Sequence, residues 1–218
     1  GNKSHNLVAV KHGLGMRIPE GFTISATTYG VLVAHNQLRP ALDLLLAGID
    51  LEFPDGLDQI SRALMTLVQG MEIPDHIADA ILAEFDGLAL NCNESSPTVA
   101  VRSSALHEDG AHSFAGQYHS LLDVDRSRLL AAYLEVCGSK YSPQALLYRI
   151  HAGIGDEDAA MAVVVQRMVD AVASGVVYTC DPTATGTGAL LVHAIHGQGL
   201  PLVGGATVPD VYSFPAGG

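Results

Sequence analysis

Residues 98–124, TVAVRSSALHEDGAHSFAGQYHSLLDV, restrict the possible folds of this chain more than any other stretch. The run Val99–Val101 is short and apolar, which is typical of a buried strand. A polar loop separates it from a second strand-like run, Tyr118–Val124. We therefore expect a hairpin whose first strand lies in the core.

Arg102 follows the buried run directly, and a guanidinium at that position needs a partner for its charge. One interpretation is a hairpin that binds phosphate, because the nearby hydroxyls and small residues let an anion approach the backbone. The other is a surface hairpin in which Arg102 pairs with Glu108 or Asp109. The residues alone leave both interpretations open.

Composition narrows the classes of function. The 218 residues are 48% hydrophobic and 16% charged, which allows a sizeable core and argues against global disorder. A net charge of -12 with 11 basic residues argues against a broad nucleic-acid surface, although a few local cations can still bind ATP. No apolar run reaches the roughly 18–20 residues that span a bilayer, so we expect no membrane partner.

The three cysteines, Cys92, Cys137 and Cys180, have neither metal-site nor redox spacing, which fits free thiols in a reducing cytoplasm. The chain starts without methionine, and we interpret it as a processed or excised fragment.

The hydrophobic periodicity predicts both strands and helices along the chain. The expected strands are 22–25, 99–102, 118–124, 162–168, 176–180 and 190–195. The expected flanking helices lie within 56–87, where Gly87 ends a helix, and within 126–151. Residues 153–158 are expected to form an acidic surface turn.

The motifs of this chain resemble those of the pyruvate-utilising dikinase family, which includes phosphoenolpyruvate synthase, pyruvate phosphate dikinase and rifampin phosphotransferase. The resemblance is carried by VRSSA at 101–105, Glu108-Asp109, SFAGQ at 113–117, GNKSHNL at 1–7, RIPEGFTIS at 17–25, VVVQRMV at 163–169, ASGVVYT at 173–179 and VPDVY at 208–212. A match spread over so many positions in the expected order is far more specific than a lone glycine motif.

The resemblance implies an α+β, two-lobed ATP-grasp fold with a mainly antiparallel sheet flanked by helices. The fold is expected to be truncated at its C-terminus, with lobes at residues 1–97 and 98–218. In the family, ATP phosphorylates a histidine on a swivelling domain, which passes the phosphoryl group to a pyruvate or other acceptor domain. By position, the resemblance assigns Lys3 and Arg102 to the phosphates, Gly116 and Ser120 to the phosphate-covering loop, and Gln166 to the adenine side. Family ligands for Mg²⁺ would lie beyond residue 218.

Some features depart from the family pattern. Its GLGE element reads Gly197-Gln198-Gly199-Leu200, so leucine stands where the family has glutamate, and the loop from Arg102 to Gly116 is about one residue shorter. Three functions therefore stay open. The first is the ATP-binding portion of a phosphoenolpyruvate synthase-like phosphotransferase that is inactive in isolation, and the second is a non-catalytic regulatory or structural ATP-grasp relic. The third is a generic α+β domain that binds no nucleotide.

The histidines do not indicate a separate activity. His193 lies in an expected strand and lacks the glycines and serine that precede a family phosphohistidine. The loop histidines His107, His112 and His119 lack the spacing of a zinc site.

Overall fold

The computed structural model describes residues 2–51, 54–92, 97–105, 120–157, 159, 161–179 and 190–215. The chain divides into two compact units, Gly1–Met168 and Val169–Gly218. Helices accompany antiparallel sheets in the described part of the chain, which confirms the α+β class.

The first unit is built on a four-stranded antiparallel sheet in the order β1-β4-β2-β3. These strands are β1 (Gly21–Ile24), β2 (Val99–Ala105), β3 (Ser120–Val124) and β4 (Met161–Arg167). The continuous apolar run of β4 predicts a central strand, and β4 does lie between β1 and β2. Because β1 pairs with β4, this unit contains strands from both expected lobes, 1–97 and 98–218, whose boundary stays a prediction.

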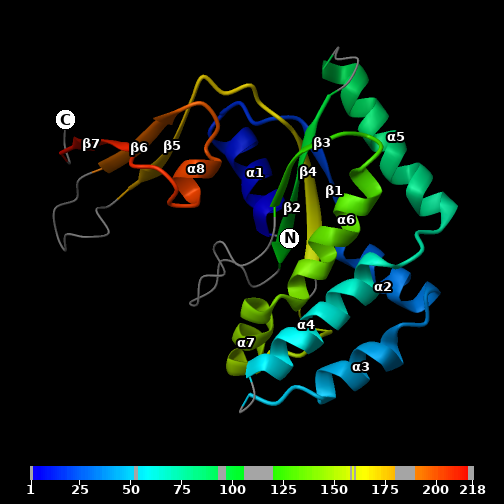
Figure 1. Ribbon diagram of the computed structural model, residues 1–218. Helices are drawn as coiled ribbons and strands as arrows, with labels where there is room; N and C mark the ends of the chain where they lie inside the picture. Colours follow the sequence, from blue (N-terminus) through cyan, green and yellow to red (C-terminus); the bar gives the residue numbers. More distant parts are fainter. Residues whose placement is uncertain are drawn as a thin grey trace. The chain divides into compact units, whose positions relative to one another are not determined.

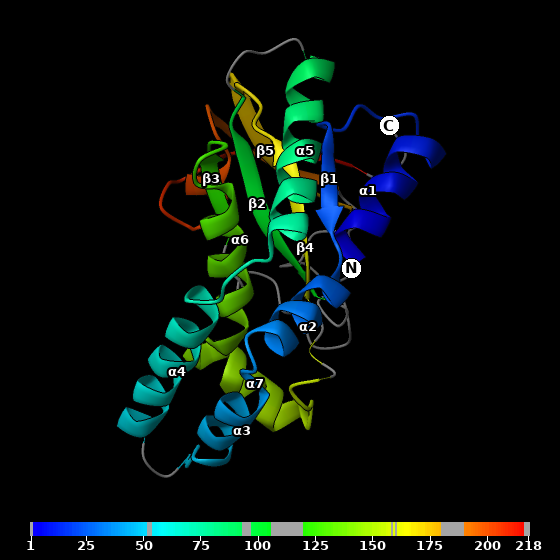
Figure 2. The same cartoon turned by 90° about the vertical axis from the view of Figure 1, so that its right-hand side faces the viewer.

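Helices cover both faces of this sheet. They are α1 (Asn2–Gly13), α2 (Ala26–His35), α3 (Arg39–Ala47), α4 (Pro54–Gln69), α5 (Asp75–Cys92), α6 (Leu129–Gly138), the 3-10 turn η1 (Ser139–Tyr141) and α7 (Pro143–Ala152). Figure 1 shows α1 on one side of the sheet and α5 and α6 on the other. In Figure 2, α3, α4 and α7 gather at one end of the unit.

The main core lies between the sheet and α2, α4, α5 and α6. Its fully buried side chains include Leu32, Leu42, Leu64, Val68, Val99, Val101, Val124, Leu129, Tyr133, Tyr141 and Leu146. Strand side chains alternate between faces, so Val99 and Val101 point to this core while Ala100 and Arg102 point to α1. The alternation thus separates an apolar face from one that carries polar groups.

The polar side of the sheet is called the α1 face below. It comprises Thr23, Ala100, Arg102, Ser104, Ser120, Val164 and Gln166, which the strand register places on one side. Gly21 belongs to the same row and lies opposite Gln166. A Cβ at Gly21 would overlap the Val165 carbonyl oxygen and lie 2.9 Å from the Gln166 Cα, so β1 approaches β4 too closely for a side chain.

The second unit holds a three-stranded antiparallel sheet in the order β5-β6-β7. Its elements are β5 (Ala173–Tyr178), β6 (Leu190–His196), the short α8 (Leu200–Val203) and β7 (Asp210–Phe214). The expected strands at 176–180 and 190–195 therefore belong to a separate sheet, and β7 adds a strand that the periodicity does not predict.

Helix α5 corrects one expected boundary. The sequence predicts an end at Gly87, but α5 continues to Cys92. Glycine inside a helix costs only about 1 kcal/mol relative to alanine. Burial of Leu88, which is 5% exposed, holds the extra turn against the core.

None of the helices in the described ranges combines the length and the hydrophobicity that crossing a membrane requires.

Candidate functional site

Arg102 and Gln166 meet on the α1 face. Arg102 stands on β2 and pairs in register with Val164, two residues before Gln166 on β4. Its Nη1 donates to the Gln166 Oε1 at 3.4 Å, and the Gln166 Nε2 donates to the Pro19 carbonyl oxygen at 3.5 Å. Gln166 is buried and Arg102 half-buried, so the glutamine is held in place beside a partly accessible guanidinium.

Helix α1 brings Lys3 to the same face. The Lys3 backbone N–H donates to the Ser104 Oγ at 3.1 Å, and its Nζ donates to the Ser103 carbonyl oxygen at 2.8 Å. One residue further, the Ser4 and Thr23 hydroxyls share a hydrogen bond of 2.9 Å. The start of α1 is therefore joined to both β1 and β2.

The remaining expected site residues are Ser120 and Gly116. Ser120 begins β3, is exposed, and pairs in register with Arg102. Gly116 lies outside the described residues, as do Glu108 and Asp109, the alternative partners for Arg102. The structure thus brings Lys3, Arg102, Ser120 and Gln166 to one face of one sheet.

The donors on the α1 face suit an anionic ligand. An ammonium, a guanidinium and serine hydroxyls can donate to phosphate oxygens, and the planar guanidinium can do so with two N–H groups. A hollow of about 100 Å³ lies between α1 and the sheet, with Leu7 and Val8 on one side and Gly21 and Gln166 on the other. Across the described residues, no three His, Cys, Asp or Glu side chains gather as metal ligands.

A second group of charges surrounds Asp156. Its carboxylate accepts from Arg149 Nη1 at 2.8 Å, Lys140 Nζ at 3.1 Å, Arg39 Nη2 at 3.1 Å and the Tyr141 hydroxyl at 3.0 Å. The side chains of Lys140 and Arg149 are each 4% exposed, and that of Asp156 is 10% exposed. The expectation of an acidic surface turn at 153–158 is therefore wrong at Asp156, because three cations and a hydroxyl stabilise its buried charge.

Burial and ion pairing shift the pKa values of these groups in opposite directions. Burial alone would raise the pKa of Asp156, but Lys140 and Arg149 outweigh it and lower the pKa from 3.8 to about 2. Burial lowers the pKa of Lys140, and Asp156 only partly opposes that shift. Burial raises the pKa of the nearby Cys137 thiol to about 12, so the thiol stays protonated near neutral pH.

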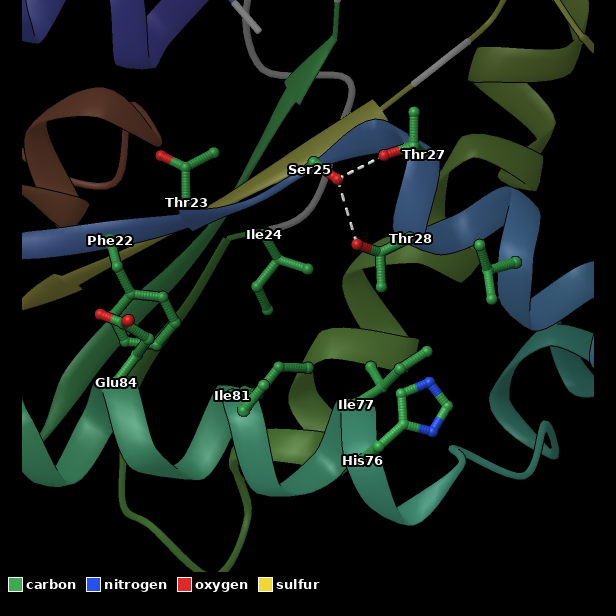
Figure 3. Close-up of a pocket in the computed structure, with 12 residues that line it drawn as sticks. Phe22, Thr23, Ile24, Ser25, Thr27, Thr28, His76, Ile77, Ile81 and Glu84 are labelled. Carbon is green, nitrogen blue, oxygen red and sulfur yellow. Dashed lines mark hydrogen bonds between the residues drawn. The ribbon is translucent and has the colours of Figure 1, made fainter.

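A larger cavity, of about 490 Å³, lies beside β1 between α2 and α5. Figure 3 shows Phe22, Ile24, Ile77 and Ile81 lining it. At one end the Ser25 hydroxyl bonds the hydroxyls of Thr27 and Thr28 at 2.6 and 3.1 Å (Figure 3). His76 and Glu84 supply its titratable groups, with no lysine or arginine among its lining residues. Its chemistry suits phosphate less well than the α1 face does.

Two features of the α1 face have no signal in the sequence. The Arg102–Gln166 contact joins positions 64 residues apart, and the Lys3–Ser104 contact joins positions 101 apart. Ser103 and Ser104 stand in the VRSSA motif, but nothing in the motif says what they contact. Asp156 is likewise one acid among several in its turn, and its partners come from α3, η1 and α7.

Comparison with known proteins shows what this chain is similar to. Residues 1–216 match the family model described as the pyruvate phosphate dikinase AMP/ATP-binding domain. The chain is 32% identical over 200 residues to a probable phosphoenolpyruvate synthase of Methanocaldococcus jannaschii, covering 91% of the chain and 17% of the relative. It is 34% identical over 222 residues to a rifampicin phosphotransferase of Streptomyces sviceus, covering 100% of the chain and 25% of the relative.

A probable phosphoenolpyruvate synthase of Methanothermobacter thermautotrophicus is 30% identical over 214 residues, covering 97% of the chain and 31% of the relative. The chain thus spans between 17% and 31% of the length of these three relatives.

Proposed function

Because the chain belongs to the AMP/ATP-binding domain family of pyruvate phosphate dikinase, we propose that it forms part of the ATP site of a phosphoenolpyruvate synthase-like phosphotransferase. The observation that carries the proposal is the convergence of Lys3, Arg102 and Gln166 on the α1 face from three elements distant in sequence. The names of the relatives support the class of reaction.

In the proposed site, Lys3 and Arg102 bind phosphate oxygens, and Ser120 and Gly116 belong to the loop that covers them. Gln166 lies toward the adenine, with its amide oriented by Arg102 and the Pro19 carbonyl. Phosphoryl transfer needs positioning and neutralisation of charge more than covalent help from the protein, and these residue types supply both.

The rest of the reaction is assigned to other parts of a longer protein. We propose an ATP-grasp arrangement in which ATP phosphorylates a histidine on a swivelling domain, from which the phosphoryl group passes to pyruvate or another acceptor. Mg²⁺ would supply positive charge that neutralises the phosphates. Its ligands are proposed to lie outside the chain described here, so the 218 residues alone should be inactive and should bind ATP weakly.

The test compares Arg102→Lys with the matched variant Arg62→Lys, which changes an exposed arginine on α4. Lysine keeps the charge at position 102 but loses the two-pronged contact. We expect phosphorylation of the histidine in the full-length polypeptide to fall by roughly ten- to a hundred-fold, which corresponds to about 1.5–3 kcal/mol. The melting temperature should change little.

Single-turnover phosphorylation and thermal melting are measured on the same preparations of both variants. If Arg102→Lys melts early while the folded fraction keeps normal activity, Arg102 is a structural residue and the proposal is wrong. Calorimetry on the 218-residue chain provides a second check, because micromolar binding of ATP would mean that the other half of the site is misassigned.

Leu200 favours the second candidate, a regulatory or structural relic. It is 60% exposed at the start of α8 and stands where the family has glutamate, and an alkyl side chain cannot bind an ammonium or a metal. Leu200→Glu restores the residue type that the family has at this position. No detectable ATP binding by the full-length polypeptide with either residue would favour the relic.

A further inference from the structure

Two hydrogen bonds join Lys3 to β2. Helix α1 begins at Asn2, so the Lys3 N–H lies in the first turn, where an amide has no carbonyl four residues before it. The Ser104 Oγ accepts this hydrogen at 3.1 Å. Ser104 therefore acts as a helix cap that another element supplies, since capping hydroxyls normally come from the residue that precedes the helix.

The second bond engages the ammonium itself. The Lys3 Nζ donates to the Ser103 carbonyl oxygen at 2.8 Å. The Met168 N–H donates to the Thr98 carbonyl oxygen, so the backbone groups of Thr98 point toward β4. Backbone groups alternate in direction along a strand, so the Ser103 carbonyl, five residues later, points toward β3. It lies one residue beyond the Arg102–Ser120 pair. The ammonium thus stands at the end of the sheet where Arg102 and Ser120 are accessible.

The strand geometry places the two cations at neighbouring positions. Arg102 and Ser104 are two residues apart on β2 and share a face, which separates their Cα atoms by roughly 6–7 Å. Ser104 is fully buried, so its hydroxyl has little freedom to choose another partner. Its bond to the Lys3 backbone fixes the point from which the lysine side chain extends beside Arg102.

We infer that Ser104 is a positioning residue for nucleotide phosphates, which acts by fixing the first turn of α1 so that Lys3 and Arg102 face the same ligand. This inference rests on the proposed function. A phosphate oxygen is a charged acceptor and competes with the neutral Ser103 carbonyl for the Lys3 ammonium. The Ser104 bond engages the backbone, so it is kept while the ammonium exchanges one acceptor for the other.

The test uses Ser104→Ala, with Ser104→Thr to restore a hydroxyl. The matched control is Ser61→Ala, which removes another buried long-range bond, from the Ser61 Oγ to the Tyr141 carbonyl oxygen at 2.7 Å. In the full-length polypeptide, the acetylation rate of each lysine by an amine-reactive ester is followed by mass spectrometry. The chain has three lysines, and the exposed Lys11 serves as the internal reference for Lys3.

We expect Ser104→Ala to speed acetylation of Lys3 relative to Lys11 and to weaken ATP binding, each by about fivefold, the loss for one hydrogen bond. Ser104→Thr should restore both values. In the wild type, ATP should slow the acetylation of Lys3. Ser61→Ala should lower the melting temperature and leave Lys3 acetylation and ATP affinity unchanged.

Unchanged Lys3 acetylation in Ser104→Ala, or no recovery in Ser104→Thr, overturns the inference. Faster acetylation with unchanged ATP affinity overturns the positioning role and leaves the proposed function standing. If acetylation responds as expected but the wild-type protein binds no ATP, the proposed function is wrong, and the role of Ser104 toward phosphate falls with it.

Discussion

The two units of this chain carry similar strands but different amounts of core. In the first unit the central strand β4 is buried from Met161 to Gln166, with helices on both faces of its sheet. In the second unit no described residue is buried, and Val172, Val208 and Val211 are 86%, 91% and 57% exposed. A sheet gains most of its stability when a second layer covers its apolar face. Both units have paired strands, so the difference in buried core should make the second unit less stable than the first.

Among the changes that should alter the stability of one unit and not the other, Asp156→Asn is expected to have the largest effect. The substitution leaves Arg39, Lys140 and Arg149 around a neutral side chain, and breaking a buried ion pair costs about 3–5 kcal/mol. The first unit should lose this much unfolding free energy, and the second should be unaffected. Native-state hydrogen exchange, read on peptides from β4 and from β6, measures the two units in one sample.

The control for this variant is Glu157→Gln, which neutralises the exposed neighbouring carboxylate. It should change protection in neither unit. Equal losses of protection in Asp156→Asn and Glu157→Gln would mean that overall charge, rather than the buried cluster, supports the first unit.

A matched pair of leucines tests the contrast in apolar packing. Leu64 on α4 is fully buried and Leu200 on α8 is 60% exposed. Leu64→Ala should destabilise the first unit by about 2–5 kcal/mol, the range for buried leucine. Leu200→Ala should stay within about 0.5 kcal/mol, as for other surface changes.

Urea unfolding followed by peptide-resolved exchange separates the two results. If Leu200→Ala costs as much as Leu64→Ala, the second unit buries Leu200 in solution. The contrast between the units would then be wrong.

The smallest expected effect is a pH dependence confined to the first unit. The pKa of Asp156 is about 2 in the folded state and 3.8 ordinarily, so folding favours the ionised form. The stabilisation is complete above about pH 4 and is lost as the pH falls through about 2. A shift of this size corresponds to ~2 kcal/mol.

Urea titrations between about pH 5 and about pH 2 measure this slope in the wild type and in Asp156→Asn, which should lack it. Asp86→Asn is the control, because the ion pair of Asp86 with Arg126 is about half exposed on both sides and solvent screens it. A slope that persists in Asp156→Asn would assign the acid sensitivity to other carboxylates.

Local patterns were enough to predict most elements of the fold. The apolar runs at 99–101 and 162–168 predict buried strands, and both lie at the centre of the sheet. The division into two sheets was not predictable in this way, because periodicity says which residues form strands and not which strands pair. β7 is short and fully exposed, so it lacks the burial pattern that marks β2 and β4.

The candidate site was predictable in its residue types and not in its contacts. An arginine at the end of a buried strand indicates a partner, and the structure supplies Gln166 from the adjacent strand. The strand register decides that contact, and a single sequence does not specify register across 64 positions. The expected loop member Gly116 lies outside the described residues, so its role stays a prediction.

The closeness of β1 to β4 at Gly21 has a consequence for natural variants of this protein. Any side chain at position 21 must push β1 away from Val165 and Gln166, and the Gln166 amide is bonded to Pro19 at the start of the same segment. An allele that replaces Gly21 would then disturb Gln166 by displacing β1. In a genetic screen such an allele would be scored with mutants of the binding site, although its cause is the spacing of two backbones.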